Sequence, residues 1–222
     1  MNPDDPGRLA ALDSYDILYS AREKLFDDVV ELASYIFSVP VARIAFVQPQ
    51  AVWHKASAGM EPQEVLAPEQ SLCPRAIVAP EPVLVYPDLE ATPDQSTPAM
   101  RARNLRFYAG APLQTSQGHC LGTLCLAGYE ARQFTVAEQG LLRQLAALVM
   151  QALEARRHLR TAQTPTAWEK LRREAEEILH NQMAMVRYLK ARGAGQVPVP
   201  ETLLTPIGKQ LAEVAQVLTV AG

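Results

Sequence analysis

The stretch FYAGAPLQTSQGHCLGTLCL, which runs from Phe107 to Leu126, decides the fold class. Its two ends, residues 107–113 and 120–126, are short apolar runs, and a polar segment with a glycine separates them. Two apolar runs joined by such a segment are typical of a β-hairpin. The glycines inside the runs indicate a bulge or the close approach of another backbone or a ligand. The sequence therefore predicts two neighbouring antiparallel strands here.

More strands are expected on the N-terminal side of this hairpin. Residues 41–47 form a β-rich run that ends at Gln48-Pro49, and residues 52–55 read as a strand paired to it. The segment 59–82 is interrupted by five prolines, so it has room only for short helical turns. Residues 82–86 predict an edge strand.

Helices are predicted before and after these strands in the sequence. Ser20 and Glu23 have the spacing of a capping box, which predicts a helix from about residue 20 to residue 38. Thr135 and Glu138 form a second box in front of a long helix. Two apolar stripes lie side by side on that helix over residues 141–159. One stripe can pack on the sheet, so the other needs a different partner.

The C-terminal third is predicted to be helical. Leu171, Ala175 and Ile178 repeat at helical spacing in a helix over 167–192, and Thr205-Pro206 reads as the start of a last short helix. Strands bracketed by helices, rather than alternating with them, favour an α+β fold with helices on one face of the sheet. We therefore expect a domain over residues 1–162 and a C-terminal helical hairpin over 163–222.

Composition narrows the class of protein. The chain has 222 residues, 48% of them hydrophobic, with a net charge of −3. This predicts an ordinary globular protein, and it argues against nucleic-acid binding, which needs concentrated positive charge. No apolar run approaches membrane-spanning length, and the N-terminus lacks the pattern of a secretory signal. Three cysteines without a Cys-x-x-Cys motif favour a reducing cytoplasm.

Several segments match one known family in chain order. The matching segments are Trp53 to Gly59, Ser71-Leu72-Cys73, Tyr86-Pro87-Asp88 and the hairpin 107–125, within a resemblance that extends from Leu12 to about Leu159. The chain resembles a GAF domain of the bacterial branch that often precedes histidine-kinase or diguanylate-cyclase modules. The resemblance implies a central antiparallel sheet with helices on one face. On the other face it implies a small-molecule pocket beneath the loops of 59–105, in a domain that senses or dimerises and does not catalyse.

The resemblance also supplies the candidate ligand pocket. Its residues are Trp53, Ser71, Cys73, Phe107, Tyr108, Gly110 and Cys125. Strand alternation points Phe107 and Tyr108 to opposite faces, so at most one of them lines the pocket. The family's cyclic-nucleotide and tetrapyrrole signatures are absent from the sequence, and near the pocket Gln48 and Pro74-Arg75 replace residues common in relatives. The ligand and any cofactor are therefore unknown.

Two alternatives to a sensor stay open. A thiol-dependent redox enzyme, such as a free methionine sulfoxide reductase, would use Cys73, which lies near Arg75 and before a helical turn. Cys120 and Cys125 are separated by an odd number of residues, which predicts that they face opposite sides of a strand. A phosphotransfer or docking protein would use His180, on a helix that faintly resembles the phosphotransfer hairpin of histidine kinases. The four histidines have no metal-binding spacing.

The leading interpretation is a non-catalytic sensory or regulatory module in bacterial signal transduction. We expect it to act as a homodimer through helices over 20–38, 136–162 and 167–192, because the double stripe at 141–159 is more than one sheet needs. A small molecule and a separate signalling protein are its expected partners.

Overall fold

The hairpin predicted at 107–126 forms strands β5 (Phe107–Gln114) and β6 (Cys120–Gly128) of a six-stranded sheet. The computed structural model describes residues 3–61, 64–162, 165–192 and 199–219. The other strands are β1 (Val41–Val47), β2 (Val52–Ala58), β3 (Val65–Leu66) and β4 (Leu84–Tyr86). Their order is β3-β2-β1-β6-β5-β4, and every neighbouring pair is antiparallel. The predicted α+β class and antiparallel sheet are confirmed.

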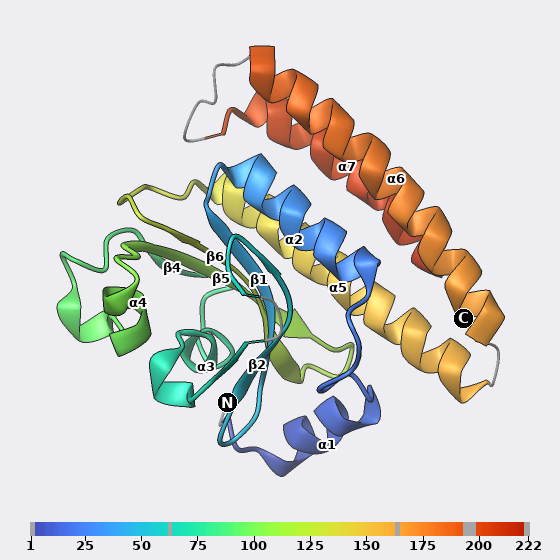
Figure 1. Cartoon of the computed structure of the whole chain (residues 1–222), viewed down its shortest axis with the longest axis horizontal. Coiled ribbons are helices and arrows are strands. Elements are labelled where there is room, and N and C mark those ends of the chain that lie inside the picture. Colours follow the sequence, from blue (N-terminus) through green and yellow to red (C-terminus); the bar gives the residue numbers. More distant parts are fainter. Residues whose placement is uncertain (1–2, 62–63, 163–164, 193–198, 220–222) are drawn as a thin grey trace.

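Helices precede and follow the strands as expected, but the first helix, over Pro6–Ser14, was not predicted from the sequence. The helices are α1 (Pro6–Ser14), α2 (Lys24–Phe37), α3 (Cys73–Ala76), α4 (Pro98–Ala102), α5 (Val136–Thr161), α6 (Pro165–Arg192) and α7 (Glu201–Thr219). Short 3₁₀ turns at Pro68–Gln70 and Pro93–Gln95 interrupt the proline-rich loops. In Figure 1, α2 and α5 cover one face of the sheet, and α3 and α4 lie on the other side with the loops. No helix in the described part of the chain has the length and apolar character needed to cross a membrane.

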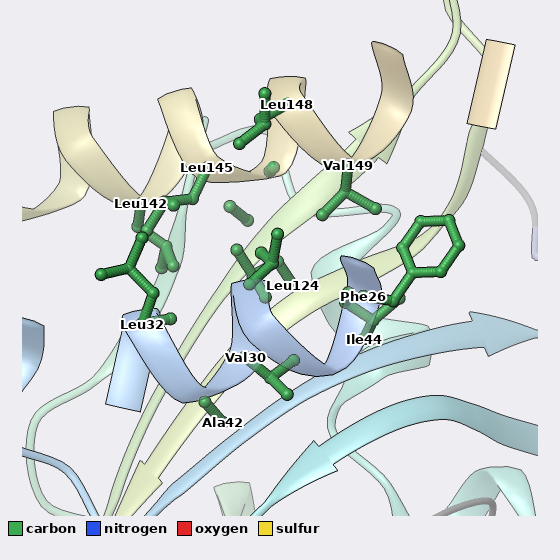
Figure 2. Close-up of a cluster of buried hydrophobic side chains, with 14 of the residues drawn as sticks. Phe26, Val30, Leu32, Ala42, Ile44, Leu124, Leu142, Leu145, Leu148 and Val149 are labelled. Carbon is green, nitrogen blue, oxygen red and sulfur yellow. The ribbon is translucent and has the colours of Figure 1, made fainter. Parts of the chain in front are cut away.

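The main core lies between the sheet and the helices α2 and α5. Ala42 and Ile44 of β1 and Leu124 of β6 point toward this helical layer, where they meet Val30 and Val149 (Figure 2). A second cluster fills the opposite face of the sheet, and it contains Val41 and Ala45 from the same strand. Successive residues of a strand point to opposite faces, so one strand serves both clusters.

The C-terminal helices α6 and α7 form a hairpin that packs on the outer side of the first helical layer. In Figure 1 the hairpin lies beyond α2 and α5 as seen from the sheet; α6 contacts α2, and α7 contacts α5. Leu211 and Val214 of α7 are buried in the same continuous core as the sheet. The second stripe of α5, for which the sequence suggested a second copy of the chain, thus has a partner within the same chain.

The predicted helix starts at Ser20 and Thr205 are wrong, whereas the one at Thr135 is right. Helix α2 begins at Lys24, and Glu23 makes no capping hydrogen bond because its carboxylate accepts from Lys55 Nζ at 2.9 Å and from Arg156 Nε at 3.0 Å. Helix α7 begins at Glu201 and includes Pro206, so Thr205-Pro206 is not its start. The capping box of Thr135 and Glu138 at the start of α5 is confirmed.

Candidate functional site

A small cavity lies on the loop side of the sheet, beneath α3 and α4. Strands β1, β2, β5 and β6 form its floor, and segments within 60–73 and 99–105 form its roof. The lining residues are Val41, Arg43, His54, Met60, Leu66, Gln70, Ser71, Leu72, Cys73, Ala99, Met100, Arg103, Leu105, Tyr108, Cys125 and Ala127. Its position is the one that the resemblance implied, beneath the loops of 59–105.

The open volume of this hollow is small. It is about 50 Å³. A water molecule needs roughly 10–15 Å³ of such volume, so the cavity holds only a few water-sized molecules. Met60 and Met100 are part of its wall. Because the methionine side chain is flexible and unbranched, Met60 and Met100 can change conformation to make room for a larger molecule.

The cavity brings together four of the seven candidate pocket residues. Ser71, Cys73, Tyr108 and Cys125 line it. Gly110 lies on the same face, paired with Cys125 and close to the ring of Tyr108, but it does not line the cavity. Of the pair that the sequence left open, Tyr108 is the one that faces the cavity.

Trp53 and Phe107 are corrections to the predicted pocket. Both are buried in the core on the helical side of the sheet, and neither lines the cavity. Trp53 stacks near Phe46 with ring centroids 6.2 Å apart, and Phe107 packs against Phe134 at 5.6 Å. The resemblance placed both residues at the pocket, but strand alternation gives each place at the cavity to the following residue, His54 or Tyr108.

Cys73 is the centre of a buried cluster of thiol and hydroxyl groups. Its Sγ lies 4.0 Å from Cys125 Sγ. The hydroxyl of Thr123 donates to this sulfur at 3.1 Å, and the hydroxyl of Tyr108 lies 3.8 Å away. The Cys73 backbone N–H donates to Ser71 Oγ at 3.2 Å. Groups from β5 and β6 therefore converge on the sulfur atom of Cys73.

The two neighbouring thiols differ in acidity. The contact with Cys125 lowers the pKa of Cys73 most, and the hydroxyls of Ser71, Thr123 and Tyr108 lower it further, against the opposing effect of burial. The same contact and burial raise the pKa of Cys125 well above its ordinary value. These opposite directions favour a thiolate on Cys73 over one on Cys125.

A charged group at one side of the cavity was not predicted from the sequence. Arg43 Nη2 forms an ion pair with Glu64 Oε2 at 2.7 Å, and Arg103 Nη2 binds Glu64 Oε1 at 2.6 Å. Arg43 Nη1 lies 3.3 Å from His54 Nε2. The sequence contained an indication of this group, because Arg43 lies in an otherwise apolar strand and His54 follows a tryptophan that is buried. A charged residue in such a strand indicates a paired charge.

His54 is held as a neutral imidazole. Arg43 can only donate, so His54 Nε2 accepts from it, while Nδ1–H donates to the Glu64 carbonyl oxygen at 2.8 Å. Burial, followed by the Arg43 cation, lowers the pKa of His54 to about 4. Burial acts to raise the pKa of Glu64, but its pairing with Arg43 and Arg103 lowers that pKa overall.

The remaining candidates lie away from the cavity. Cys120 is on the same face of the sheet as Cys125, contrary to the prediction from their odd spacing, because an irregularity between Leu113 and Gln114 makes β5 skip one residue of β6. Burial raises the pKa of Cys120, and its side chain does not line the cavity. His180 is exposed on α6. Within the described residues no three His, Cys, Asp or Glu side chains cluster as metal ligands.

Comparison with known proteins points to one family. The sequence profile of the GAF domain matches residues 21–153. The chain is 29% identical over 168 residues to the cyclic di-GMP phosphodiesterase PA2567 of Pseudomonas aeruginosa, a match that covers 73% of this chain and 28% of that protein. The chain thus spans about a quarter of the length of this curated relative.

Solved structures agree on the fold. The GAF domain of an Acinetobacter phosphoenolpyruvate-protein phosphotransferase superposes with a TM-score of 0.50 at 16% identity, over 71% of this chain and 98% of that one. The blue-light absorbing form of the PixJ GAF domain of Thermosynechococcus elongatus also gives 0.50, at 15% identity, over 71% and 94%. At such identities the likeness concerns the fold alone.

Proposed function

The chain belongs to the GAF domain family, and we propose that it is a non-catalytic regulatory module of bacterial signal transduction that responds to a small molecule. The observation that carries this proposal is the two-sided sheet. Its strands have the cavity on one face and the helices α2 and α5 on the other. Arg43 and Cys125 reach the cavity, while their neighbours Ile44 and Leu124 reach the helical layer.

This arrangement offers a direct path for a signal. A molecule in the cavity that displaces β1 or β6 also displaces the residues that pack on α2 and α5. Those helices in turn support the hairpin α6–α7. A ligand shifts such an arrangement only by binding one state more tightly than the other. The proposal therefore requires two packings of the helices that differ at the cavity.

The cavity volume sets the class of ligand. In this arrangement the 50 Å³ accept a molecule of only a few heavy atoms. A larger ligand has to displace Met60 or Met100 from the cavity wall. The match covers only 28% of the cyclic di-GMP phosphodiesterase of Pseudomonas aeruginosa. The proposal for this chain therefore does not include phosphodiesterase activity.

We further propose that residues 1–162 form the sensing domain and that the hairpin from residue 163 onward presents the output surface to a separate signalling protein. The three cysteines are all free thiols, which suits a reducing cytoplasm. A homodimer through the helices stays part of the proposal. Because α7 covers α5, the second copy has to use outward surfaces, where Tyr35 of α2 and Tyr188 of α6 are exposed.

Native mass spectrometry tests the sensing proposal. We expect the purified chain to retain a small molecule that is lost on denaturation. Ala99→Leu on α4 fills the cavity, so it should remove this added mass, whereas Ala102→Leu, exposed on the same short helix, should not. The proposal fails if wild type has no added mass and Ala99→Leu only raises the melting temperature, as expected for filling an empty void. The domain would then be a scaffold.

A further inference from the structure

We propose that Cys73 and Cys125 are a peroxide-responsive thiol pair that closes to a reversible disulfide when a small hydroperoxide enters the cavity. This deepens the proposed function by naming a class of stimulus. It rests on that function only for the downstream response, because the disulfide itself can be detected directly.

The first support is the geometry of the pair. The two sulfur atoms are 4.0 Å apart, and a disulfide needs about 2.05 Å, so an approach of roughly 2 Å closes the bond. Cys125 sits on the central strand β6, whereas Cys73 begins the four-residue helix α3 between two loops. The movement can therefore come from α3 without disturbing the sheet pairing of β6.

The second support is the division of roles between the two sulfurs. The hydroxyl of Thr123 donates to Cys73 Sγ, and the hydroxyl of Tyr108 is aimed at the same atom. These donors stabilise a thiolate on Cys73, the form that attacks peroxides. Cys125 retains its proton and lies where a resolving thiol is needed.

The third support is the cavity that both sulfurs line. Its volume suits a molecule of two oxygen atoms and a few more heavy atoms at most. Only these two of the three cysteines line it; Cys120 is on the same face of the sheet but outside the lining. Cys73 and Cys125 are therefore the expected reactive pair, and Cys120 serves as a control within the same protein.

The reaction balances with a hydroperoxide as oxidant. The Cys73 thiolate attacks one peroxide oxygen, the O–O bond breaks, and the leaving oxygen takes a proton to become water or an alcohol. Cys73 is then a sulfenic acid. The Cys125 sulfur attacks the Cys73 sulfur, the S–O bond breaks, and water leaves with the Cys125 proton. A dithiol reductant reverses the disulfide by exchange and becomes a disulfide itself.

The test is peroxide oxidation of the full chain, followed by alkylation of the remaining thiols and peptide mass spectrometry. With one equivalent of hydrogen peroxide we expect a peptide linked through Cys73 and Cys125, one remaining thiol at Cys120, and full recovery of three thiols with dithiothreitol. Cys73→Ser should lower the rate of peroxide consumption at least tenfold. Cys125→Ser should stop at a sulfenic acid that dimedone traps, and Cys120→Ser should react like wild type.

Several outcomes would overturn the inference. Three thiols surviving peroxide, linkage through Cys120, or equal peroxide consumption by Cys73→Ser and wild type would each exclude the pair. Circular dichroism and a parallel Cys73→Ala variant separate a lost thiol from a lost fold. A ligand found by native mass spectrometry with no disulfide would sink the inference and leave the proposed function. If the disulfide forms but hydrogen exchange at α5 does not change, peroxide is not the stimulus of the proposed regulatory function.

Discussion

Two polar residues on the cavity wall, His54 and Arg43, are almost fully buried. His54 is 2% exposed, and Arg43 beside it is 6% exposed. Both are satisfied by Glu64, through its carboxylate for Arg43 and through its backbone carbonyl for His54. Arg103 adds a second cation to the same carboxylate. Buried charges are tolerated only when paired, so this group ties residue 64 and the α4 segment to β1 and β2.

The neutral state of His54 makes stability depend on pH. Its pKa is about 4 in the folded protein against 6.5 for a free histidine, so between these values the unfolded chain binds the extra proton. The contribution of His54 to stability is therefore fully present above pH 6.5 and is lost as the pH falls toward 4. We expect wild type to lose roughly 2 kcal/mol between pH 7 and pH 5, at about 1.4 kcal/mol per pKa unit.

Urea unfolding at the two pH values measures this loss. His54→Gln should remove most of the difference, whereas His180→Gln, at an exposed position on α6, should leave it unchanged. Equal pH dependence of wild type and His54→Gln would show that His54 is not held neutral.

At the scale of elements, the close pairing of β1 and β6 determines the centre of the sheet. Gly122 of β6 lies so near β1 that an added Cβ would stand 1.9 Å from the Ala45 carbonyl oxygen and 2.9 Å from Phe46 Cα. The glycine is thus required by the close approach of another backbone, one of the explanations that the sequence left open, and it also lies beside the irregularity in β6. Gly140 of α5 is the opposite case, because nothing lies within 4 Å of an added Cβ there.

These two glycines give a matched pair of alanine substitutions. Gly122→Ala has to push β1 and β6 apart, and we expect it to lower the free energy of unfolding by about 3 kcal/mol. Gly140→Ala should raise it by roughly 0.5–1 kcal/mol, because alanine favours the helix over glycine. Urea unfolding followed by circular dichroism checks both. A Gly122→Ala protein as stable as wild type would contradict the spacing of β1 and β6.

At the scale of the whole molecule, the hairpin α6–α7 decides which surfaces face other molecules. It covers the outer side of α2 and α5, including the stripe from which the sequence predicted a dimer. The large side chains left outside include Tyr35 on α2 and Tyr188 on α6, which is 60% exposed. Arg187 lies over the ring of Tyr35 at 5.4 Å, so α2 and α6 share one outer surface. We place the proposed dimer contact on this surface.

Light scattering tests this assignment. At tens of micromolar we expect twice the chain mass of 24.4 kDa. Tyr188→Glu should shift the protein to the monomer, because it puts a charge into the proposed contact. Tyr129→Glu, at a tyrosine of similar exposure outside the helices, should remain dimeric. A wild-type monomer would remove the dimer from the proposed function, and dimerisation of Tyr188→Glu would place the contact elsewhere.

Much of the fold was predictable because its signals are local. The hairpin 107–126, the capping box at Thr135 and the edge strand before Pro87 each depend on neighbours in the sequence, and the structure has all three. The box at Ser20 was wrong because Glu23 binds Lys55 and Arg156, more than thirty residues away. No local pattern reveals that a carboxylate has a stronger distant partner.

The sequence by itself determined the order of the main strands and of the long helices, the antiparallel sheet and the apolar faces of α2 and α5, since the periods of strands and helices are properties of short segments. Only the tertiary structure decided that Tyr108, and not Phe107, reaches the cavity, that Cys73 meets Cys125, and that α7 covers α5. Each of these depends on the register and packing of segments far apart in the chain. A one-residue irregularity in a strand reverses which face a side chain occupies, and composition does not record it.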